Sequence, residues 1–190
     1  MKVNNNEFLT WYHKKFTPCY SKNEWLWIYE DQLAILNLIT KYDIKSYLEI
    51  GTYKGYTSML VWLHPNIERV LAVDIHKDLG IPFYEGEHTK LLDKSEYGQY
   101  FKNTPAEIVF CDSKKWTTDE KFDMVYIDAK HDAENSTANG ELARKISNKI
   151  VAFHDSTYPK YGVVQYLDKI RKEGKTVTIF DGTTVGYFEV

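Results

Sequence analysis

The chain has little of what marks disulfide-rich, membrane-spanning or nucleic-acid-binding proteins. Its 190 residues include two cysteines, Cys19 and Cys111, too few for a disulfide framework or for a zinc site of their own. No apolar run approaches the ~18–20 residues of a membrane-spanning helix. Lys and Arg number 24 against 27 Asp and Glu, so there is no excess of positive charge to attract nucleic acid. We therefore expect a protein of the reducing cytoplasm without membrane or nucleic-acid partners.

What the chain does have is a regular alternation of apolar strand-like runs and helical segments. The pattern predicts strands at residues 45–50, 69–74, 106–112, 122–128, 149–155, 176–180 and 182–190, and helices at 5–16, 23–42, 56–63, 133–147 and 162–173. Such alternation is typical of an α/β protein whose parallel sheet carries helices on both faces. The last two strands are separated only by DGTT, which predicts a hairpin and an antiparallel final strand. We expect a Rossmann-like, doubly wound sheet of seven mostly parallel strands.

The chain contains no linker-like segment that would split it into two domains. We expect a single domain over residues 1–190, in which the aromatic-rich residues 1–44 form a helical cap and residues 45–190 form the ligand-binding core. The segment EGEH (85–88) lies in a long link between the second and third strands, where a solvated loop and a substrate lid both remain open. The oligomeric state is not readable from these patterns.

The stretch LEIGTYKGYTS (48–58) places Gly51 and Gly55 directly behind the first strand. A phosphate-binding loop would add a lysine followed by Ser or Thr, but here Lys54 precedes Gly55. The dinucleotide fingerprint G-x-G-x-x-G would need a second glycine where this chain has Tyr53, which disfavours a nicotinamide cofactor. This turn therefore suits a ligand without phosphates.

Acidic residues stand at or near the ends of five predicted strands: Glu49, Asp74, Asp112, Asp128 and Asp155. In doubly wound sheets, ligands bind outside the carboxyl ends of the strands. Asp74 lies 23 residues after Gly51, close to the ~20-residue offset at which an acid reaches ribose hydroxyls. Together these positions indicate an adenosine ligand without a 2′-phosphate.

The stretch LEIGTYKGYTS resembles the first motif of class I S-adenosylmethionine-dependent methyltransferases, in the form found in catechol- and caffeoyl-CoA-type O-methyltransferases. The resemblance runs from about Lys45 to the C-terminus and implies that residues 45–190 form an S-adenosylmethionine-binding core. It implies three groups of cofactor contacts: Glu49, Gly51, Tyr53, Gly55 and Thr57 around the aminoacyl arm, Asp74 at the ribose, and Asp112 and Ser113 beside the adenine, with Asp128 as a further contact.

The same resemblance implies where the chemistry occurs. The D-x-x-H spacing of Asp128 and His131 is similar to that of antibiotic-sugar O-methyltransferases, in which the histidine is the general base. In catechol-type enzymes, acids at the ends of the fourth and fifth strands hold a divalent metal, which here implies Asp128 and Asp155. The next ligand position carries His154 or Ser156 where relatives have a second acid or an asparagine. Since Mg²⁺ prefers oxygen ligands, His154 leaves open a weaker site, a softer metal or no metal.

We expect an S-adenosylmethionine-dependent enzyme that O-methylates a small-molecule hydroxyl. Two alternatives remain open: a methyltransferase for nucleic acid or protein, and a non-catalytic S-adenosylmethionine-binding protein. The chain has no Pro-Pro pair, so the N-P-P-[YFW] motif of base amino-methylating enzymes is absent. The identity of the methyl acceptor is not encoded in any pattern we recognise.

Overall fold

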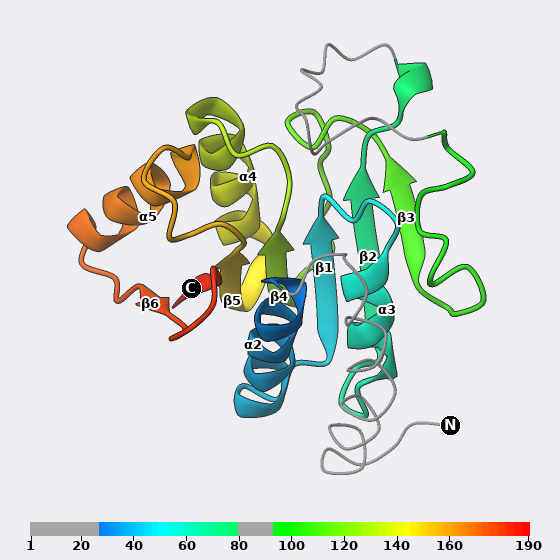
Figure 1. Ribbon diagram of the computed structural model, residues 1–190, viewed down its shortest axis with the longest axis horizontal. Coiled ribbons are helices and arrows are strands. Elements are labelled where there is room, and N and C mark those ends of the chain that lie inside the picture. Colours follow the sequence, from blue (N-terminus) through cyan, green and yellow to red (C-terminus); the bar gives the residue numbers. More distant parts are fainter. Residues whose placement is uncertain (1–26, 80–92) are drawn as a thin grey trace.

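The computed structural model describes residues 27–79 and 93–190. Seven strands form one sheet in the order β3-β2-β1-β4-β5-β7-β6 (Figure 1). The strands are β1 Ser46–Ile50, β2 Arg69–Asp74, β3 Glu107–Phe110, β4 Phe122–Ile127, β5 Ser147–Phe153, β6 Thr178–Ile179 and β7 Gly186–Glu189. Strands β1 to β5 pair in parallel, and β7 is antiparallel to both β5 and β6. The predicted Rossmann-like sheet with an antiparallel last strand is confirmed.

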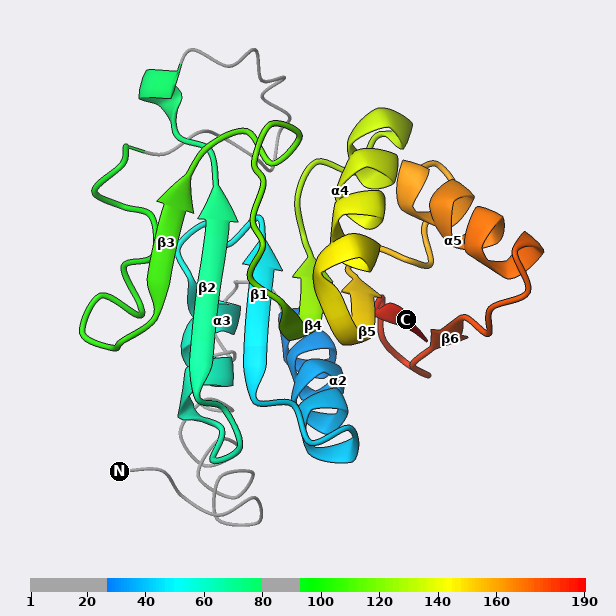
Figure 2. The same cartoon turned by 180° about the vertical axis from the view of Figure 1, so that it is seen from behind.

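Helices cover both faces of this sheet. They are α2 Trp27–Lys41, α3 Tyr56–Leu63, α4 Ala133–Ile146 and α5 Gly162–Lys172, with a short 3₁₀ turn at Lys77–Leu79. Helices α2 and α3 lie on one face, and α4 and α5 lie on the other (Figures 1 and 2). The helix predicted at 5–16, the first residues of the helix predicted at 23–42 and the EGEH segment lie outside the described residues.

Alternating side chains of the strands build two separate hydrophobic cores. Tyr47 of β1 and Met124 of β4 pair in register and pack toward α2 and α3. The next residues along, Leu48 and Val125, also pair and pack toward α4 and α5. Because successive side chains of a strand point to opposite faces, apolar runs such as MV and YL serve both cores. Burial on both faces thus holds the sheet rigid beneath the loops at its carboxyl edge.

Several strand boundaries differ from the sequence prediction, and those of β5 and β6 have a clear physical reason. Strand β5 begins at Ser147, directly after α4 ends at Ile146, whereas we predicted a strand from residue 149. Ser147 closes the helix and opens the strand, since its N–H donates to Ala143 O and its hydroxyl donates to Ile150 O at 2.8 Å. The strand predicted at 176–180 is only two residues long, because only Thr178 and Ile179 pair with β7.

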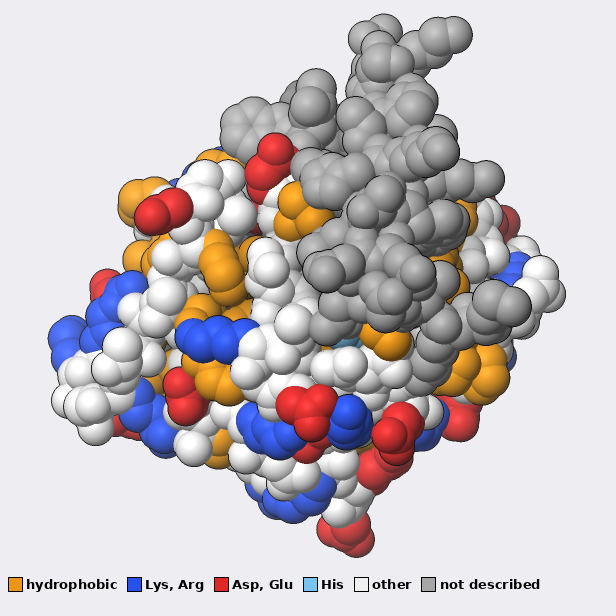
Figure 3. Space-filling model, turned by 90° about the horizontal axis from the view of Figure 1, so that it is seen from below, with side chains coloured by type: hydrophobic (Ala, Val, Ile, Leu, Met, Phe, Trp, Pro, Cys, Tyr) orange, Lys and Arg blue, Asp and Glu red, His pale blue; other side chains and the backbone are white. Residues whose placement is uncertain are grey.

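The surface carries a mixture of charges. On the face in Figure 3, outside the grey residues, Lys and Arg side chains lie among Asp and Glu side chains. Ion pairs such as Lys45–Asp43 at 2.7 Å and Arg69–Glu107 at 2.9 Å account for part of this mixture. Among the described residues, no helix is long and apolar enough to cross a membrane.

Candidate active site

The carboxyl ends of β1 and β4 lie side by side, where the strand order reverses direction along the sheet. Gly51 N–H donates to Val73 O at 2.8 Å, and Asp128 N–H donates to Ile50 O at 2.9 Å. These two bonds extend the parallel ladder by one residue beyond β1 and β4. The glycine turn and Asp128 therefore meet at the position where doubly wound sheets bind their ligands.

The turn between β1 and α3 depends on left-handed backbone conformations. Gly51, Tyr53 and Gly55 have φ values of 89°, 50° and 82°. A Cβ on Gly51 would lie 2.2 Å from Asp128 O, so this glycine is required by the neighbouring backbone as well as by its φ angle. The backbone of Asp128 and Ala129 fills the space that a side chain at Gly51 would occupy. Gly55, the N-cap residue of α3, has no side chain that could cap this helix, so the first N–H groups of α3 suit a ligand carboxylate.

Asp74 stabilises this turn from the end of β2. Its Oδ2 accepts hydrogen bonds from Thr52 N–H at 2.8 Å and Tyr53 N–H at 2.7 Å, and its Oδ1 accepts one from Ile75 N–H at 2.6 Å. Burial raises the pKa of Asp74 to about 6, although these N–H donors oppose the rise. The sequence predicted a ribose ligand for this carboxylate and did not predict its bonds to the turn.

Glu49 is buried beneath the same turn. Its Oε2 accepts hydrogen bonds from the hydroxyls of Thr52, at 2.6 Å, and Ser58. Burial raises the pKa of Glu49 to about 7, and the two hydroxyl donors only partly oppose this rise. Glu49 therefore holds the turn and the start of α3 together in addition to any contact with a ligand.

Replacing Glu49 with glutamine should remove a pH-dependent contribution to the free energy of unfolding. The folded pKa of about 7 exceeds the ordinary value of 4.5, so stability from this group is complete below pH 4.5 and is lost as the pH rises to about 7. Between pH 5 and pH 8, wild type should lose about 2–3 kcal/mol more stability than Glu49→Gln in urea unfolding. The exposed Glu68→Gln serves as a control that keeps the wild-type profile. Identical profiles for wild type and Glu49→Gln would refute this assignment.

Asp112 and Ser113 lie two and three residues beyond β3, on the far side of β2 from the glycine turn. Asp112 Oδ1 accepts a hydrogen bond from Lys114 N–H at 3.0 Å, and Ser113 Oγ donates to Asn139 Oδ1 of α4 at 2.7 Å. Both side chains therefore have local structural partners. Asp112 and Ser113 lie at the same edge of the sheet as Asp74. Among the described residues, no side-chain hydrogen bond joins them to the Asp74 carboxylate.

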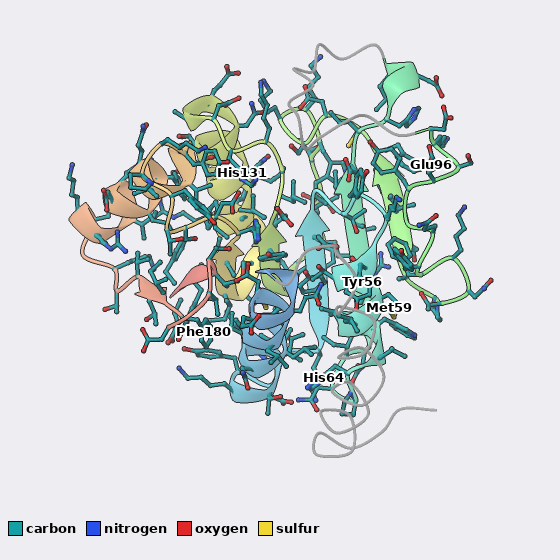
Figure 4. The ribbon with its side chains drawn as sticks, viewed as in Figure 1. Tyr56, Met59, His64, Glu96, His131 and Phe180 are labelled. Atoms are coloured by element: carbon teal, nitrogen blue, oxygen red, sulfur yellow. The ribbon has the colours of Figure 1, made fainter. Side chains whose placement is uncertain are left out.

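His131 lies on the segment between β4 and α4 (Figure 4). Its Nε2 is 3.1 Å from Asp155 Oδ2 and 3.9 Å from Asp128 Oδ1. The Tyr161 ring packs against the His131 ring with centroids 5.2 Å apart, and His131 O accepts a hydrogen bond from Gly162 N–H at 2.7 Å. The D-x-x-H pair of the sequence is thus joined by Asp155, which the fold supplies from the end of β5.

His154 lies among three carboxylates. Its Nδ1 is 3.3 Å from Asp128 Oδ1 and 3.2 Å from Asp155 Oδ1, and its Nε2 is 2.9 Å from Asp31 Oδ2. Burial lowers the pKa of His154, but these carboxylates raise it well above its usual value. Burial raises the pKa of Asp128, but the neighbouring His154 and His131 outweigh burial and bring this pKa below its usual value.

Asp31 and Thr184 are site residues that the sequence did not reveal. Asp31 lies near the start of α2 and is 4% exposed, while Thr184 lies just before β7. Thr184 O accepts a hydrogen bond from Ser156 N–H at 2.8 Å, and Thr184 Oγ1 accepts one from Asp155 N–H at 3.4 Å. These contacts support Asp155 in a left-handed conformation, with φ 56°. No local pattern around Asp31 or Thr184 distinguishes them from ordinary helix and turn residues.

The side chains around His154 include a donor set suited to a metal ion. Ligand atoms of Asp128, His131 and His154 lie within 4.8 Å of one another. His154 Nδ1 is buried and neither of its carboxylate contacts is aligned as a hydrogen bond, so within the described residues this nitrogen makes no hydrogen bond. A buried nitrogen facing carboxylate oxygens is an arrangement that a divalent cation would satisfy.

A cavity of about 380 Å³ lies beside these residues. It is lined by Glu30, Asp31, Thr157, Tyr158, Gly182, Thr183 and Thr184. Asp31 and Thr184 belong both to this cavity and to the network around His154. The volume falls within the ~300–1,000 Å³ range of small-molecule sites.

Comparison with known proteins identifies the family. Residues 48–156, more than half of the chain, match the sequence model of a family described as a methyltransferase domain. The chain therefore belongs to this methyltransferase family, and it is an S-adenosylmethionine-dependent enzyme. A comparison with curated protein sequences gives no significant match.

Three solved structures share the fold at low sequence identity. CalS11, a TDP-rhamnose 3′-O-methyltransferase of calicheamicin biosynthesis, has a TM-score of 0.62 and 13% identity over 100% of this chain and 88% of that one. An O-methyltransferase from Bacillus cereus, in complex with S-adenosylhomocysteine, has a TM-score of 0.55 and 17% sequence identity. The match covers 97% of this chain and 88% of that one. The N-methyltransferase NodS from Bradyrhizobium japonicum WM9, also in complex with S-adenosylhomocysteine, has a TM-score of 0.58 and 14% sequence identity. The match covers 97% of this chain and 96% of that one.

Proposed function

We propose that the chain transfers the methyl group of S-adenosylmethionine to a hydroxyl of a small molecule, with His131 as the general base. The observation that carries this proposal is the 3.1 Å contact between His131 Nε2 and Asp155 Oδ2, beside Asp128 and the glycine turn. A carboxylate that engages one imidazole nitrogen leaves the other free to take a proton. This arrangement suits an acceptor hydroxyl, which must lose its proton as it is methylated.

The glycine turn and the strand ends would bind the methyl donor. We assign Glu49, Gly51, Tyr53, Gly55 and Thr57 to its aminoacyl arm, Asp74 to its ribose, Asp112 and Ser113 to its adenine, and Asp128 to the reacting end. When bound, S-adenosylmethionine supplies an electrophilic methyl group on a sulfonium. The uncapped N-terminus of α3 supports the assignment of the aminoacyl carboxylate to this turn. Asp74 Oδ2 accepts both turn N–H groups, whereas Oδ1 accepts the Ile75 N–H and retains a second lone pair for a ribose hydroxyl.

The chain would act mainly by alignment. His131 would take the proton of the acceptor oxygen as that oxygen is methylated. Asp155 fixes the orientation of the imidazole, and Tyr161 packs against its ring. The cavity beside Asp31 supports a small acceptor rather than a macromolecule, because its volume matches a ligand of that size.

Asp128, Asp155 and His154 would hold a divalent ion. Carboxylate oxygens and an imidazole nitrogen are suitable donors for such an ion, and Asp128 and His154 belong, with His131 and without Asp155, to the group whose ligand atoms lie within 4.8 Å of one another. When bound, the ion supplies positive charge that lowers the pKa of the acceptor hydroxyl. The same nitrogen and oxygen atoms lie next to His131, so the base and the ion would serve the same acceptor.

Screening acceptor classes with radiolabelled S-adenosylmethionine tests this function. We expect label to pass to small molecules with a phenolic or sugar hydroxyl, and the methyl carbon chemical shift of the product should be that of a methoxy group. Oligonucleotides and unfolded protein should stay unlabelled. Transfer confined to nucleic acid or protein would contradict the proposal. Binding of S-adenosylhomocysteine without transfer to any acceptor would instead favour a non-catalytic binding protein.

A further inference from the structure

Asp31 connects helix α2 with the carboxyl edge of β5. This carboxylate is buried, and both of its oxygens are engaged. Oδ1 accepts a hydrogen bond from Thr184 N–H at 2.7 Å, and Oδ2 accepts one from Thr184 Oγ1 at 2.6 Å. Oδ2 also lies 2.9 Å from His154 Nε2. Since Thr184 holds Asp31 at two points, Asp31 offers His154 a fixed acceptor.

The contact with Asp31 determines which nitrogen of His154 faces the other acids. A proton on Nε2 is held by Asp31, so Nδ1 is the nitrogen that points toward Asp128 Oδ1 and Asp155 Oδ1, at 3.3 and 3.2 Å. Carboxylates that accept the second ring N–H of a metal-bound histidine orient the ring and raise its ligand strength. Asp31 has the position and the partner for this role.

We propose that Asp31 is a positioning residue that presents His154 Nδ1 to a divalent ion beside Asp128, and that this site prefers Mn²⁺ or Co²⁺ to Mg²⁺. The inference rests on the cation site of the proposed function. One imidazole nitrogen among carboxylate oxygens favours ions with higher nitrogen affinity, whereas Mg²⁺ prefers an all-oxygen octahedron. The preference therefore follows from a histidine ligand that Asp31 holds in one orientation.

Calorimetric titration of the full chain, saturated with S-adenosylhomocysteine, with Mn²⁺, Co²⁺ and Mg²⁺ tests the proposal. Wild type should bind Mn²⁺ and Co²⁺ at least about tenfold more tightly than Mg²⁺. Asp31→Asn keeps an oxygen for Thr184 N–H but weakens the acceptor for His154, so it should weaken Mn²⁺ and Co²⁺ binding by about 10–100-fold. Glu30→Gln is the matched control, because Glu30 is the adjacent acid, lines the same cavity and should leave ion affinity unchanged.

A second comparison separates positioning from a purely structural role. If Asp31 acts through His154, the double variant Asp31→Asn, His154→Ala should bind Mn²⁺ no more weakly than His154→Ala alone. Thermal unfolding and affinity for S-adenosylhomocysteine establish that each variant is folded. Wild-type ion affinity in Asp31→Asn, additive losses, a preference for Mg²⁺ or no ion bound to wild type would each overturn the inference. Failure of wild type to bind S-adenosylhomocysteine would instead overturn the proposed function.

Discussion

Replacing His131 with alanine is expected to lower the turnover of methyl transfer by about 10²–10⁴-fold, the contribution typical of a general base. The structure supports this expectation because His131 Nε2 lies 3.1 Å from Asp155 Oδ2, which orients the ring. Affinity for S-adenosylhomocysteine should remain close to that of wild type, since none of the turn residues around Gly51 or Asp74 contacts His131 in the hydrogen bonds we describe. Single-turnover rates and calorimetry on the same preparation measure both quantities.

Lys130→Ala provides a matched control on the same segment. Lys130 is exposed and pairs with Asp132 at 2.9 Å, so its loss should leave turnover unchanged. Bound metal should also be measured in His131→Ala, because His131 belongs to the group of possible metal ligands. Loss of the ion together with activity would make His131 a ligand rather than the base, and wild-type turnover would make it a bystander.

Gly51→Ala is expected to destabilise the fold by about 2–5 kcal/mol and to lower turnover by about 10²-fold. The new Cβ would lie 2.2 Å from Asp128 O and 2.8 Å from Ala129 Cα, and these backbone atoms cannot rotate away as a side chain would. Overpacking costs about 1–3 kcal/mol, and a left-handed conformation adds about 1–2 kcal/mol for a residue with a Cβ. The rate should fall because Asp128 moves, and misplacement of about 1 Å can cost about 10²-fold.

Gly174→Ala isolates the two costs. Gly174 has the same φ of 89° as Gly51, but among the described residues no atom beyond its chain neighbours lies within 4 Å of the Cβ position. This variant should lose only the ~1–2 kcal/mol of backbone strain and keep full turnover. Urea unfolding and initial rates of both variants make the comparison. Equal losses of stability in the two variants would show that contact with Asp128 is not what makes Gly51 necessary.

The sequence alone determined most of the fold. Short apolar runs, helical spacing and glycine turns are local properties, and they predicted the five parallel strands, the helices after residue 56 and the antiparallel hairpin at the end. The length of β6 and the junction at Ser147 were wrong by a few residues. Strand pairing ends where neighbouring backbones diverge, and a helix can continue directly into a strand. The spacing of apolar residues along the chain predicts neither of these features.

The sequence also predicted which short stretches would carry the site, since the glycine turn, Asp74, Asp128 and His131 were all proposed from spacing and resemblance. Only the tertiary structure decided what surrounds them. Asp31 meets His154 across most of the chain, and Asp74 bonds to the N–H groups of the turn. Burial, which depends on every packed element, raises the pKa of Glu49 to about 7. Such properties arise from contacts between distant segments, and local residue patterns carry no record of them.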